Sequence, residues 1–268
     1  MKNGLSIIIC CYNSSSKLPQ TLAHIINQQT SDFPWEVIIV NNASTDRTAE
    51  VAEELLNQHQ NSVNYKIITE NKAGLAHARN TGIATAKYEY IVFCDDDNWL
   101  CETYISTAYH TLKQNPQIGA IGGKGEAVCI GSFPDWFEAD QIAYAVGAQG
   151  KSPGDVTARG YLYGAGLVTK KSLYQAMFDS FPSLLVGRTG EKMTSGEDTE
   201  YCLRLVLKGY KLYYNEDLRF KHFIEEKRIN IDYRDQLFQS FRDTDVILNK
   251  YFHAIKTTAN VKDFTRKY

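Results

Sequence analysis

The sequence predicts an α/β fold in which helices flank a mostly parallel central sheet, with a helical C-terminal extension. Three observations indicate the sheet. Apolar runs alternate with segments of helical periodicity through the first hundred residues, and their spacing suits βαβ units. In addition, residues 5–11 form an apolar and β-branched run that is typical of a strand buried on both faces. Strands joined through helices in this way lie parallel, with right-handed crossovers.

The predicted elements follow in order along the chain. Apolar runs indicate strands at 5–11, 35–40, 65–69, 90–94 and 118–129, and shorter ones at 164–168, 210–214 and 218–222. Apolar residues at helical spacing indicate helices at 18–26, 48–56, 73–86 and 197–207. Ser44 or Thr45 is the expected N-cap of the second helix, and Gly209 follows the end of the fourth. Residues 131–160 are loop-rich, and the pattern from residue 233 onward is helical.

Composition excludes some classes of protein. The 29 basic and 31 acidic residues nearly cancel, to a formal net charge of −2. This argues against nucleic acid as the main partner, because proteins that bind the phosphate backbone carry a basic excess. The six cysteines form no C-x-x-C pair, which predicts reduced thiols and a cytoplasmic protein. No repeat or linker divides the chain, so we expect one domain over residues 1–224 with an extension at 225–268.

Polar residues follow each of the first four predicted strands. These segments are 12–15, 41–46, 70–74 and 95–97. The carboxyl ends of parallel strands meet at one edge of the sheet, which is where such folds bind their ligands. Each segment alone is ordinary turn chemistry, but four in succession predict a binding site.

Asp95, Asp96 and Asp97 form the first group of candidate site residues. Alternate side chains of a strand share a face, so Asp95 and Asp97 can converge while Asp96 points away. Adjacent carboxylates repel one another unless a cation neutralises them, and a divalent ion that also binds substrate phosphates suits this arrangement. The alternative is an acidic loop, or the first turn of a helix that begins before Trp99.

Glu197 and Asp198, at the start of a predicted helix, form the second group. One of them can act as a general base, or Ser195 and Asp198 can form a variant of the capping box. His222, at the end of a strand, is either a packed histidine or a nitrogen ligand that favours Mn²⁺ over Mg²⁺. Arg79 can bind a phosphate oxygen bidentately or pair with a surface acid.

Together these motifs resemble a known family. The chain reads Cys-Cys-Tyr-Asn at 10–13, Val-Asn-Asn-Ala-Ser-Thr-Asp at 40–46 and Asn-Lys-Ala-Gly at 71–74. Ala-Arg-Asn-Thr-Gly at 78–82, Asp-Asp-Asp at 95–97 and Gly-Glu-Asp-Thr-Glu at 196–200 follow, and then Arg204. In order and spacing, the set resembles the family-2 glycosyltransferases of the GT-A fold over about residues 5–222.

The resemblance implies an inverting transferase that uses a nucleotide-diphosphate sugar and a divalent cation, Mn²⁺ or Mg²⁺. It implies a nucleotide-binding half at about residues 1–100 and an acceptor half at about 101–224. Asp198 would be the base, Glu197 would orient the acceptor, and Asp97 would bind the metal, with His222 as a candidate second ligand. The residues implied to bind the nucleotide sugar are Cys11, Tyr12, Asn13, Asn41, Asn42, Ser44, Lys72, Gly74, Arg79, Asp95, Asp96, Gly164, Ala165 and Gly166.

One departure concerns the base of the nucleotide. The family usually has an aspartate at the position of Asn41, and that acid commonly contacts the base. Asparagine keeps an acceptor oxygen, loses the charge and adds a donor. UDP remains the favoured nucleotide.

The expected function is sugar transfer to a hydroxyl of a glycan or lipid-linked acceptor, in bacterial surface polysaccharide synthesis. Trp136 and Phe137 either stack on the acceptor sugar or belong to a local hydrophobic cluster. Residues 225–268 pack on the core, pair two subunits as a homodimer, or attach the cytoplasmic protein to the inner face of the membrane. Two other functions fit less well: a sugar-phosphate nucleotidyltransferase, and a non-catalytic module that binds nucleotide sugars.

Overall fold

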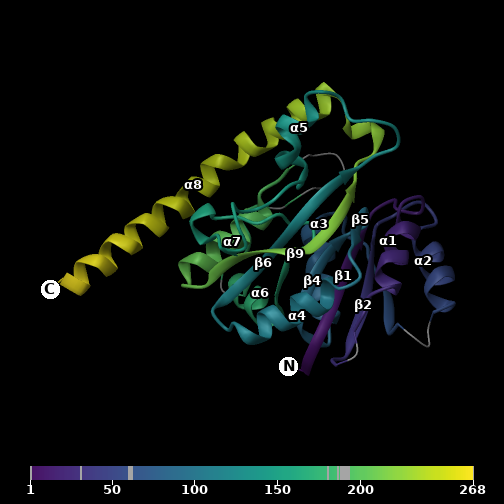
Figure 1. The fold of residues 1–268 in the computed structure, drawn as a ribbon, viewed down its shortest axis with the longest axis horizontal. Coiled ribbons are helices and arrows are strands. Elements are labelled where there is room, and N and C mark those ends of the chain that lie inside the picture. The colour runs from purple at the N-terminus through teal and green to yellow at the C-terminus, as the bar shows by residue number, and fades with distance from the viewer. Residues whose placement is uncertain are drawn as a thin grey trace.

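Within the described residues, nine strands form one mixed sheet (Figure 1). The computed structural model describes residues 2–30, 32–59, 63–179, 181–185, 187 and 194–267, with side chains up to residue 257. The strands are β1 (Lys2–Cys11), β2 (Trp35–Asn42), β3 (Tyr65–Glu70), β4 (Tyr88–Asp95), β5 (Asn98–Leu100), β6 (Ile118–Val128), β7 (Gly154–Asp155), β8 (Val168–Lys170) and β9 (Lys211–Phe223).

Helices connect these strands and cover both faces of the sheet. The α-helices are α1 (Leu18–Ile26), α2 (Thr48–Asn57), α3 (Leu75–Thr85), α4 (Tyr104–Gln114), α5 (Phe137–Asp140), α6 (Lys171–Phe178), α7 (Glu197–Leu207) and α8 (Ile231–Lys267). Three short 3₁₀ helices are η1 (Gln141–Tyr144), η2 (Thr157–Arg159) and η3 (Glu226–Arg228).

The sheet has a parallel part and a mixed part. Its strand order is β3-β2-β1-β4-β8-β6-β9-β5, and β7 pairs with β9. The first four strands in this order are all parallel, β8 runs antiparallel to both of its neighbours, and β6 and β9 are parallel to each other. The predicted α/β fold with a helical extension is confirmed.

The central strand β1 shows why the sequence folds this way. Side chains of successive strand residues point to opposite faces. Ile7 and Ile9 accordingly pack into one hydrophobic cluster with α1, α2 and α4, while Ile8 packs into a second cluster with α3, α6 and α7. All three are fully buried. Each such side chain contributes roughly 1.5–3 kcal/mol to folding, which explains the unbroken apolar run.

Helix α3 lies unusually close to the sheet. A Cβ at Gly82 would collide with Cγ2 of Ile8 and come within 3.2 Å of Cγ2 of Val40. Only glycine allows this approach, which fixes α3 and its side chains at the edge where β1 and β2 end.

Several sequence-based details are wrong. The predicted strands at 210–214 and 218–222 are one strand, β9, because the register between Gly122 and Lys124 shifts and accommodates the polar residues between them. Residues 164–167 form a turn, and β8 begins only at Val168. Neither Ser44 nor Thr45 caps α2; Asp46 Oδ1 accepts the Thr48 N–H at 3.1 Å. Helices α4 and α6 were not predicted.

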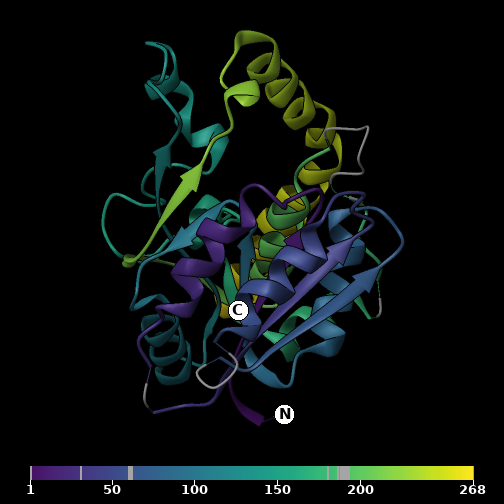
Figure 2. The same ribbon diagram turned by 90° about the vertical axis from the view of Figure 1, so that its right-hand side faces the viewer.

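The long helix α8 projects from the body of the molecule, with the C-terminus at its far end (Figure 1). Figure 2 shows its beginning beyond the tip of β9, at the same end as the segment that carries α5 and η1. Further along, Tyr251 donates a hydrogen bond of 2.7 Å to Glu200 of α7, which also pairs with Arg204 at 2.6 Å. This buried network holds α8 on α7. Across the part of the chain that the structure describes, no helix is long and apolar enough to cross a membrane.

Candidate active site

The loops after β1 and β2 are tied together at the carboxyl edge of the sheet. The strand register pairs Cys11 with Asn41. The backbone N–H of Asn13 donates to Ser44 Oγ at 3.1 Å, and the Thr45 N–H donates to Asn13 Oδ1 at 2.8 Å. Asn13 has a φ of 50°, a left-handed conformation that asparagine tolerates better than most residues. The structure thus brings Asn13, Asn41 and Ser44 to one place.

The two asparagines that end β2 have different partners. Asn42 is 4% exposed; its Nδ2 donates to the carbonyls of Glu70 and Lys72 at 3.0 and 2.8 Å, and its Oδ1 accepts the Gly74 N–H at 2.8 Å. Its side chain therefore holds the loop after β3. By contrast, Asn41 Oδ1 is buried without a hydrogen-bond partner. An unpaired buried acceptor costs about 1–3 kcal/mol, which indicates a place for a ligand donor.

Three other predicted nucleotide-binding residues differ in access. Tyr12 is 49% exposed, so its ring can contact a ligand. Cys11 is buried in the core, and only its backbone can reach one. Lys72 is exposed, and its backbone N–H donates to Glu70 at 2.8 Å.

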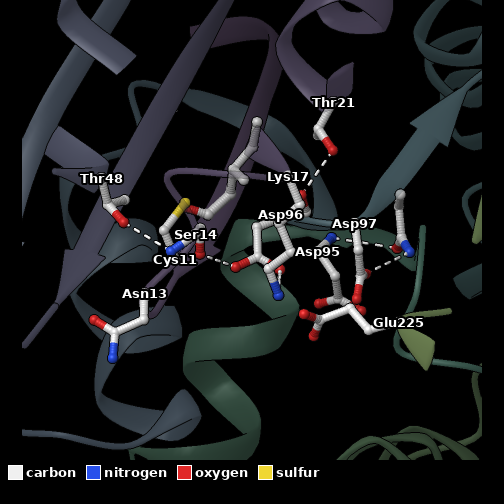
Figure 3. Close-up of polar contacts among 12 residues, drawn as sticks. Cys11, Asn13, Ser14, Lys17, Thr21, Thr48, Asp95, Asp96, Asp97 and Glu225 are labelled. Atoms are coloured by element: carbon white, nitrogen blue, oxygen red, sulfur yellow. Dashed lines mark hydrogen bonds and ion pairs between the residues drawn. The ribbon is translucent and has the colours of Figure 1, made fainter. Parts of the chain in front are cut away.

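Asp96 has a structural role (Figure 3). Its carboxylate accepts a hydrogen bond from Ser14 and forms an ion pair with Lys17 at 2.9 Å. Thr21 Oγ1 donates to its backbone carbonyl at 2.7 Å. Burial raises the pKa of Asp96 to about 6. Because these partners belong to α1 and the loop before it, Asp96 anchors that helix.

Asp97 lies in a different environment. Its Oδ1 is 3.4 Å from His222 Nε2 and accepts a hydrogen bond of 3.2 Å from Asn98, and its Oδ2 accepts one of 3.2 Å from Arg228 Nη1. Burial opposes ionisation, but the positive charge of His222 in its protonated form, and then that of Arg228, lower the pKa of Asp97. Asp97 is therefore a charged carboxylate. The alternative that these aspartates open a helix is wrong, because strand β5 begins at Asn98.

The Asp97–His222 pair fits a divalent cation. His222 Nδ1 is 2.7 Å from the carbonyl of Tyr144, so Nδ1 carries the proton and Nε2 presents its lone pair toward Asp97. Ligand atoms that share a small cation lie about 3 Å apart. The described side chains contain no cluster of three or more His, Cys, Asp or Glu residues that could hold a metal, so water and phosphate oxygens would complete the shell.

Asp198 forms an ion pair with Arg79 of α3. Arg79 is 4% exposed, and its guanidinium lies 4.9 Å from the centre of the Phe93 ring. Burial lowers the pKa of Arg79, but Asp198 together with the acidic groups of Glu197, Tyr174 and Asp95 outweighs this effect and raises it. The side chain of Arg79 therefore reaches the predicted base.

The capping alternative for Asp198 is wrong. Gly196 is the N-cap of α7, with a φ of 99° and no side-chain capping bond, and Ser195 Oγ lies 3.0 Å from Ser240 Oγ. Glu197 lies in the same first turn. A Cβ at Gly164 would lie 2.5 Å from Cγ of Asp198, so the carboxylate needs glycine there.

The neighbours of Gly164 have separate roles. Ala165 packs in the core, and the carbonyl of Gly166 accepts a hydrogen bond of 2.6 Å from Tyr104. These contacts with the core and with Tyr104 hold in place the turn that brings Gly164 against Asp198.

Asp95 connects the two halves of the site. Burial and then Asp97 raise its pKa, Arg79 and His222 lower it, and Asp198 raises it. Its carboxyl is therefore within electrostatic reach of both the Asp97–His222 pair and the Asp198–Arg79 pair.

The aromatic pair at 136–137 lies in a cluster with Tyr144 and Leu237. Phe137 is 4% exposed and packs 4.1 Å from the ring centre of Phe133, as in the local-cluster alternative. Phe137 also lines a cavity of about 1320 Å³ beside β5, β6 and β9.

Sequence reasoning missed Ser14, Lys17, Tyr144 and Arg228. Ser14 lies within the polar segment 12–15, but no individual role was predicted for it, and Arg228 lies within the predicted extension at 225–268. No local pattern distinguishes Arg228 from its exposed neighbours, since its partner Asp97 lies far away in sequence.

Comparison with known proteins shows what this chain is similar to. Residues 6–130 match the family model described as Glycosyl transferase family 2. This match covers a little under half of the chain and shows what that segment is similar to. The chain is 31% identical over 144 residues to glycosyltransferase GlyG of Streptococcus pneumoniae, covering 54% of this chain and 44% of that protein. It is 25% identical over 254 residues to the poly-beta-1,6-N-acetyl-D-glucosamine synthase of Staphylococcus aureus, covering 95% of this chain and 58% of that protein. The chain thus spans about half the length of these relatives.

Solved structures show the same fold. TarS 1–349 of S. aureus in complex with UDP-GlcNAc has a TM-score of 0.61 at 18% identity, covering 83% of this chain and 58% of that chain. The mannosyltransferase PcManGT from Pyrobaculum calidifontis, in complex with GDP-Man and Mn²⁺, has a TM-score of 0.61 at 18% identity, covering 85% and 59%. The predicted GT-A fold is confirmed.

Proposed function

We propose that this family-2 glycosyltransferase moves a sugar from a UDP-sugar to an acceptor hydroxyl with inversion at the anomeric carbon. The observation that carries the proposal is that the Asp97–His222 and Asp198–Arg79 pairs both lie within electrostatic reach of Asp95. One pair suits a cation that binds phosphates, and the other holds a carboxylate. Inverting transfer needs both: charge neutralisation on the departing diphosphate and a base for the attacking hydroxyl.

Asn41 supports uracil as the base of the donor. Its buried Oδ1 has no partner within the protein. Uracil presents an N–H between two carbonyls, so the Asn41 amide can accept from that N–H and donate to one neighbouring carbonyl. Tyr12, half-exposed beside it, can pack on the base or ribose.

Asp198 takes the proton in this mechanism. The acceptor oxygen bonds to the anomeric carbon as the bond from that carbon to the phosphate oxygen breaks, and the hydroxyl proton passes to Asp198. Arg79 binds Oδ1 of Asp198, which fixes the carboxylate and leaves Oδ2 for the acceptor. The absence of a side chain at Gly164 leaves room for this carboxylate.

Asp97 and His222 would hold the divalent cation, Mn²⁺ or Mg²⁺. When bound, the cation supplies Lewis-acid stabilisation of the leaving diphosphate. Beside a neutral His222, the Arg228 guanidinium still lowers the pKa of Asp97 and favours its ionised form. The Tyr144 carbonyl fixes the tautomer in which His222 Nε2 can act as a ligand. Mn²⁺ suits a mixed nitrogen and oxygen site better than Mg²⁺ does.

The proposed acceptor is a glycan or lipid-linked saccharide in bacterial surface polysaccharide synthesis, on the cytoplasmic side of the membrane. The supporting observation is the polysaccharide synthase among the relatives, which aligns with 95% of this chain. The acceptor half is proposed at about residues 101–224, on the side of Asp198.

Transfer chemistry can be tested without knowing the acceptor. The protein is incubated with Mn²⁺ and a panel of UDP-, GDP-, CDP- and dTDP-sugars, and slow release of the nucleotide diphosphate is measured. We expect release from a UDP-sugar. Release of pyrophosphate would indicate a nucleotidyltransferase, and binding without turnover in any acceptor mixture would indicate a non-catalytic binding module.

A further inference from the structure

We propose that Arg228 binds the diphosphate of the donor, next to the cation that Asp97 and His222 would hold. The proposal rests on the donor assigned above. It adds a residue outside the family match, which ends at residue 130, and outside every motif of the sequence.

Arg228 is a buried cation with an unsatisfied donor. Its side chain is 12% exposed, and its Nη1 donates to Asp97 Oδ2 at 3.2 Å. Its Nε is buried and has no hydrogen-bond partner. A guanidinium has five N–H donors and stays charged, and an unpaired donor on a buried charge costs more than one on a neutral group. The position therefore suits an additional anionic acceptor from a ligand.

The geometry around Asp97 indicates which anion this is. Its Oδ1 faces His222 and its Oδ2 faces Arg228, so the proposed cation and the guanidinium flank the same carboxylate. A diphosphate bound to that cation would lie beside Arg228. Because Nη1 can remain on Asp97, Nε can donate to a phosphate oxygen while the existing ion pair persists. Arginine matches phosphate oxygens with paired, charge-assisted hydrogen bonds.

The backbone of Arg228 is held by the same residue that positions His222. The Tyr144 hydroxyl donates to the Arg228 carbonyl at 3.1 Å, and the Tyr144 carbonyl accepts from His222 Nδ1 at 2.7 Å. Tyr144 is 1% exposed. Arg228 is thus positioned before the donor arrives, and the entropy cost of ordering it on binding is small.

This position gives Arg228 a role in the reaction as well as in binding. When the bond between the sugar carbon and the phosphate oxygen breaks, its electron pair stays on the diphosphate. The charge on the leaving group grows, and a fixed guanidinium beside it binds the transition state more strongly than the ground state. If Arg228 only neutralised Asp97, removing it would not affect the diphosphate.

The test compares UDP with uridine in two variants. Arg228→Gln removes the positive charge and leaves only a neutral amide donor near the position of Nε. Lys227→Gln changes the adjacent residue, which is 75% exposed and pairs with Glu225, not with Asp97. Calorimetry with UDP and Mn²⁺ should show about 10- to 100-fold weaker binding to Arg228→Gln, the loss of one charge-assisted hydrogen bond. Uridine, titrated by NMR, should bind this variant as it binds the wild type. Lys227→Gln should bind both ligands normally.

Mn²⁺ titrated without nucleotide gives a second readout. Arg228→Gln should bind Mn²⁺ several-fold more tightly, because a positive charge beside Asp97 is gone. Weaker Mn²⁺ binding would overturn the proposal, as would an equal loss of affinity for UDP and uridine, since either would mean that Arg228 only shapes the site. Normal UDP binding by Arg228→Gln would overturn it while leaving the donor assignment intact. A wild-type protein that binds no UDP with Mn²⁺ would overturn both.

Discussion

Gly164→Ala moves the proposed base without changing any group that reacts. An ideal Cβ at position 164 would lie 2.5 Å from Cγ and 2.7 Å from Oδ1 of Asp198, whereas ordinary contacts begin at 3.4 Å. The backbone of Gly164 lies outside the left-handed region, so alanine itself is not strained there. The Asp198 carboxylate must then move by about 1 Å. A displacement of this size costs about 10²-fold in rate, or about 2.7 kcal/mol of transition-state stabilisation.

The assay is UDP release in the presence of Mn²⁺ and acceptor, with UDP affinity measured in parallel by calorimetry. Gly164→Ala should lower the rate about 10²-fold and leave UDP affinity unchanged. The control is the same substitution combined with Asp198→Asn, which should be no slower than Asp198→Asn alone, because the base is already lost. A normal rate for Gly164→Ala, or a double variant far slower than Asp198→Asn, would refute the reasoning.

Four further predictions test the rest of the site and its support. Asn41→Leu should weaken UDP binding about 10-fold by calorimetry, while Asn41→Asp keeps the acceptor and most of the affinity; unchanged binding in Asn41→Leu would contradict the assigned base contact. Arg79→Gln should lower kcat with UDP affinity retained, and an equal loss of both would make Arg79 a nucleotide ligand instead. His222→Ala should weaken Mn²⁺ binding at least 10-fold in a titration without nucleotide, and equal affinity would exclude it as a ligand. Burial opposes ionisation of Glu200, but hydrogen bonds from Leu184, Ser183, Tyr251 and Arg204 lower its pKa below 4.5. Its stabilising effect should be present above pH 4.5 and fade as the pH falls, so the difference in unfolding free energy between wild type and Glu200→Gln should narrow in acid; a constant difference would contradict this.

The parallel half of the fold could be predicted because its signal is local. Residues 5–11 are apolar at consecutive positions, and a strand buried on both faces needs that pattern. Strand β9 was harder, because the polar residues 215–217 resemble a turn and only the shifted register against β6 keeps them within one strand. Helix α4 was not predicted because its apolar face is weakly marked in the sequence. Two of its buried residues, Tyr104 and Tyr109, are tyrosines, whose hydroxyls make them less clear markers of a buried face than aliphatic residues.

The site residues also differ in whether local sequence could identify them. Asp97 and Asp198 stand in motifs, so their sequence context identified them as candidates. The partners could not be found in this way: Arg79 lies 119 residues from Asp198, and Arg228 lies 131 residues from Asp97. The functional distinction between Asn41 and Asn42 also depends on tertiary structure, because only the fold shows which amide the loop after β3 already occupies.

The most direct test of the central claim is a comparison of wild type and Asp198→Asn with a UDP-sugar, Mn²⁺ and an acceptor. Two quantities are measured on each protein: donor affinity by calorimetry and transfer rate by UDP release. The account predicts unchanged donor affinity and a transfer rate lower by about 10²-fold or more, the usual scale for loss of a general base. Near-normal transfer by Asp198→Asn would contradict it.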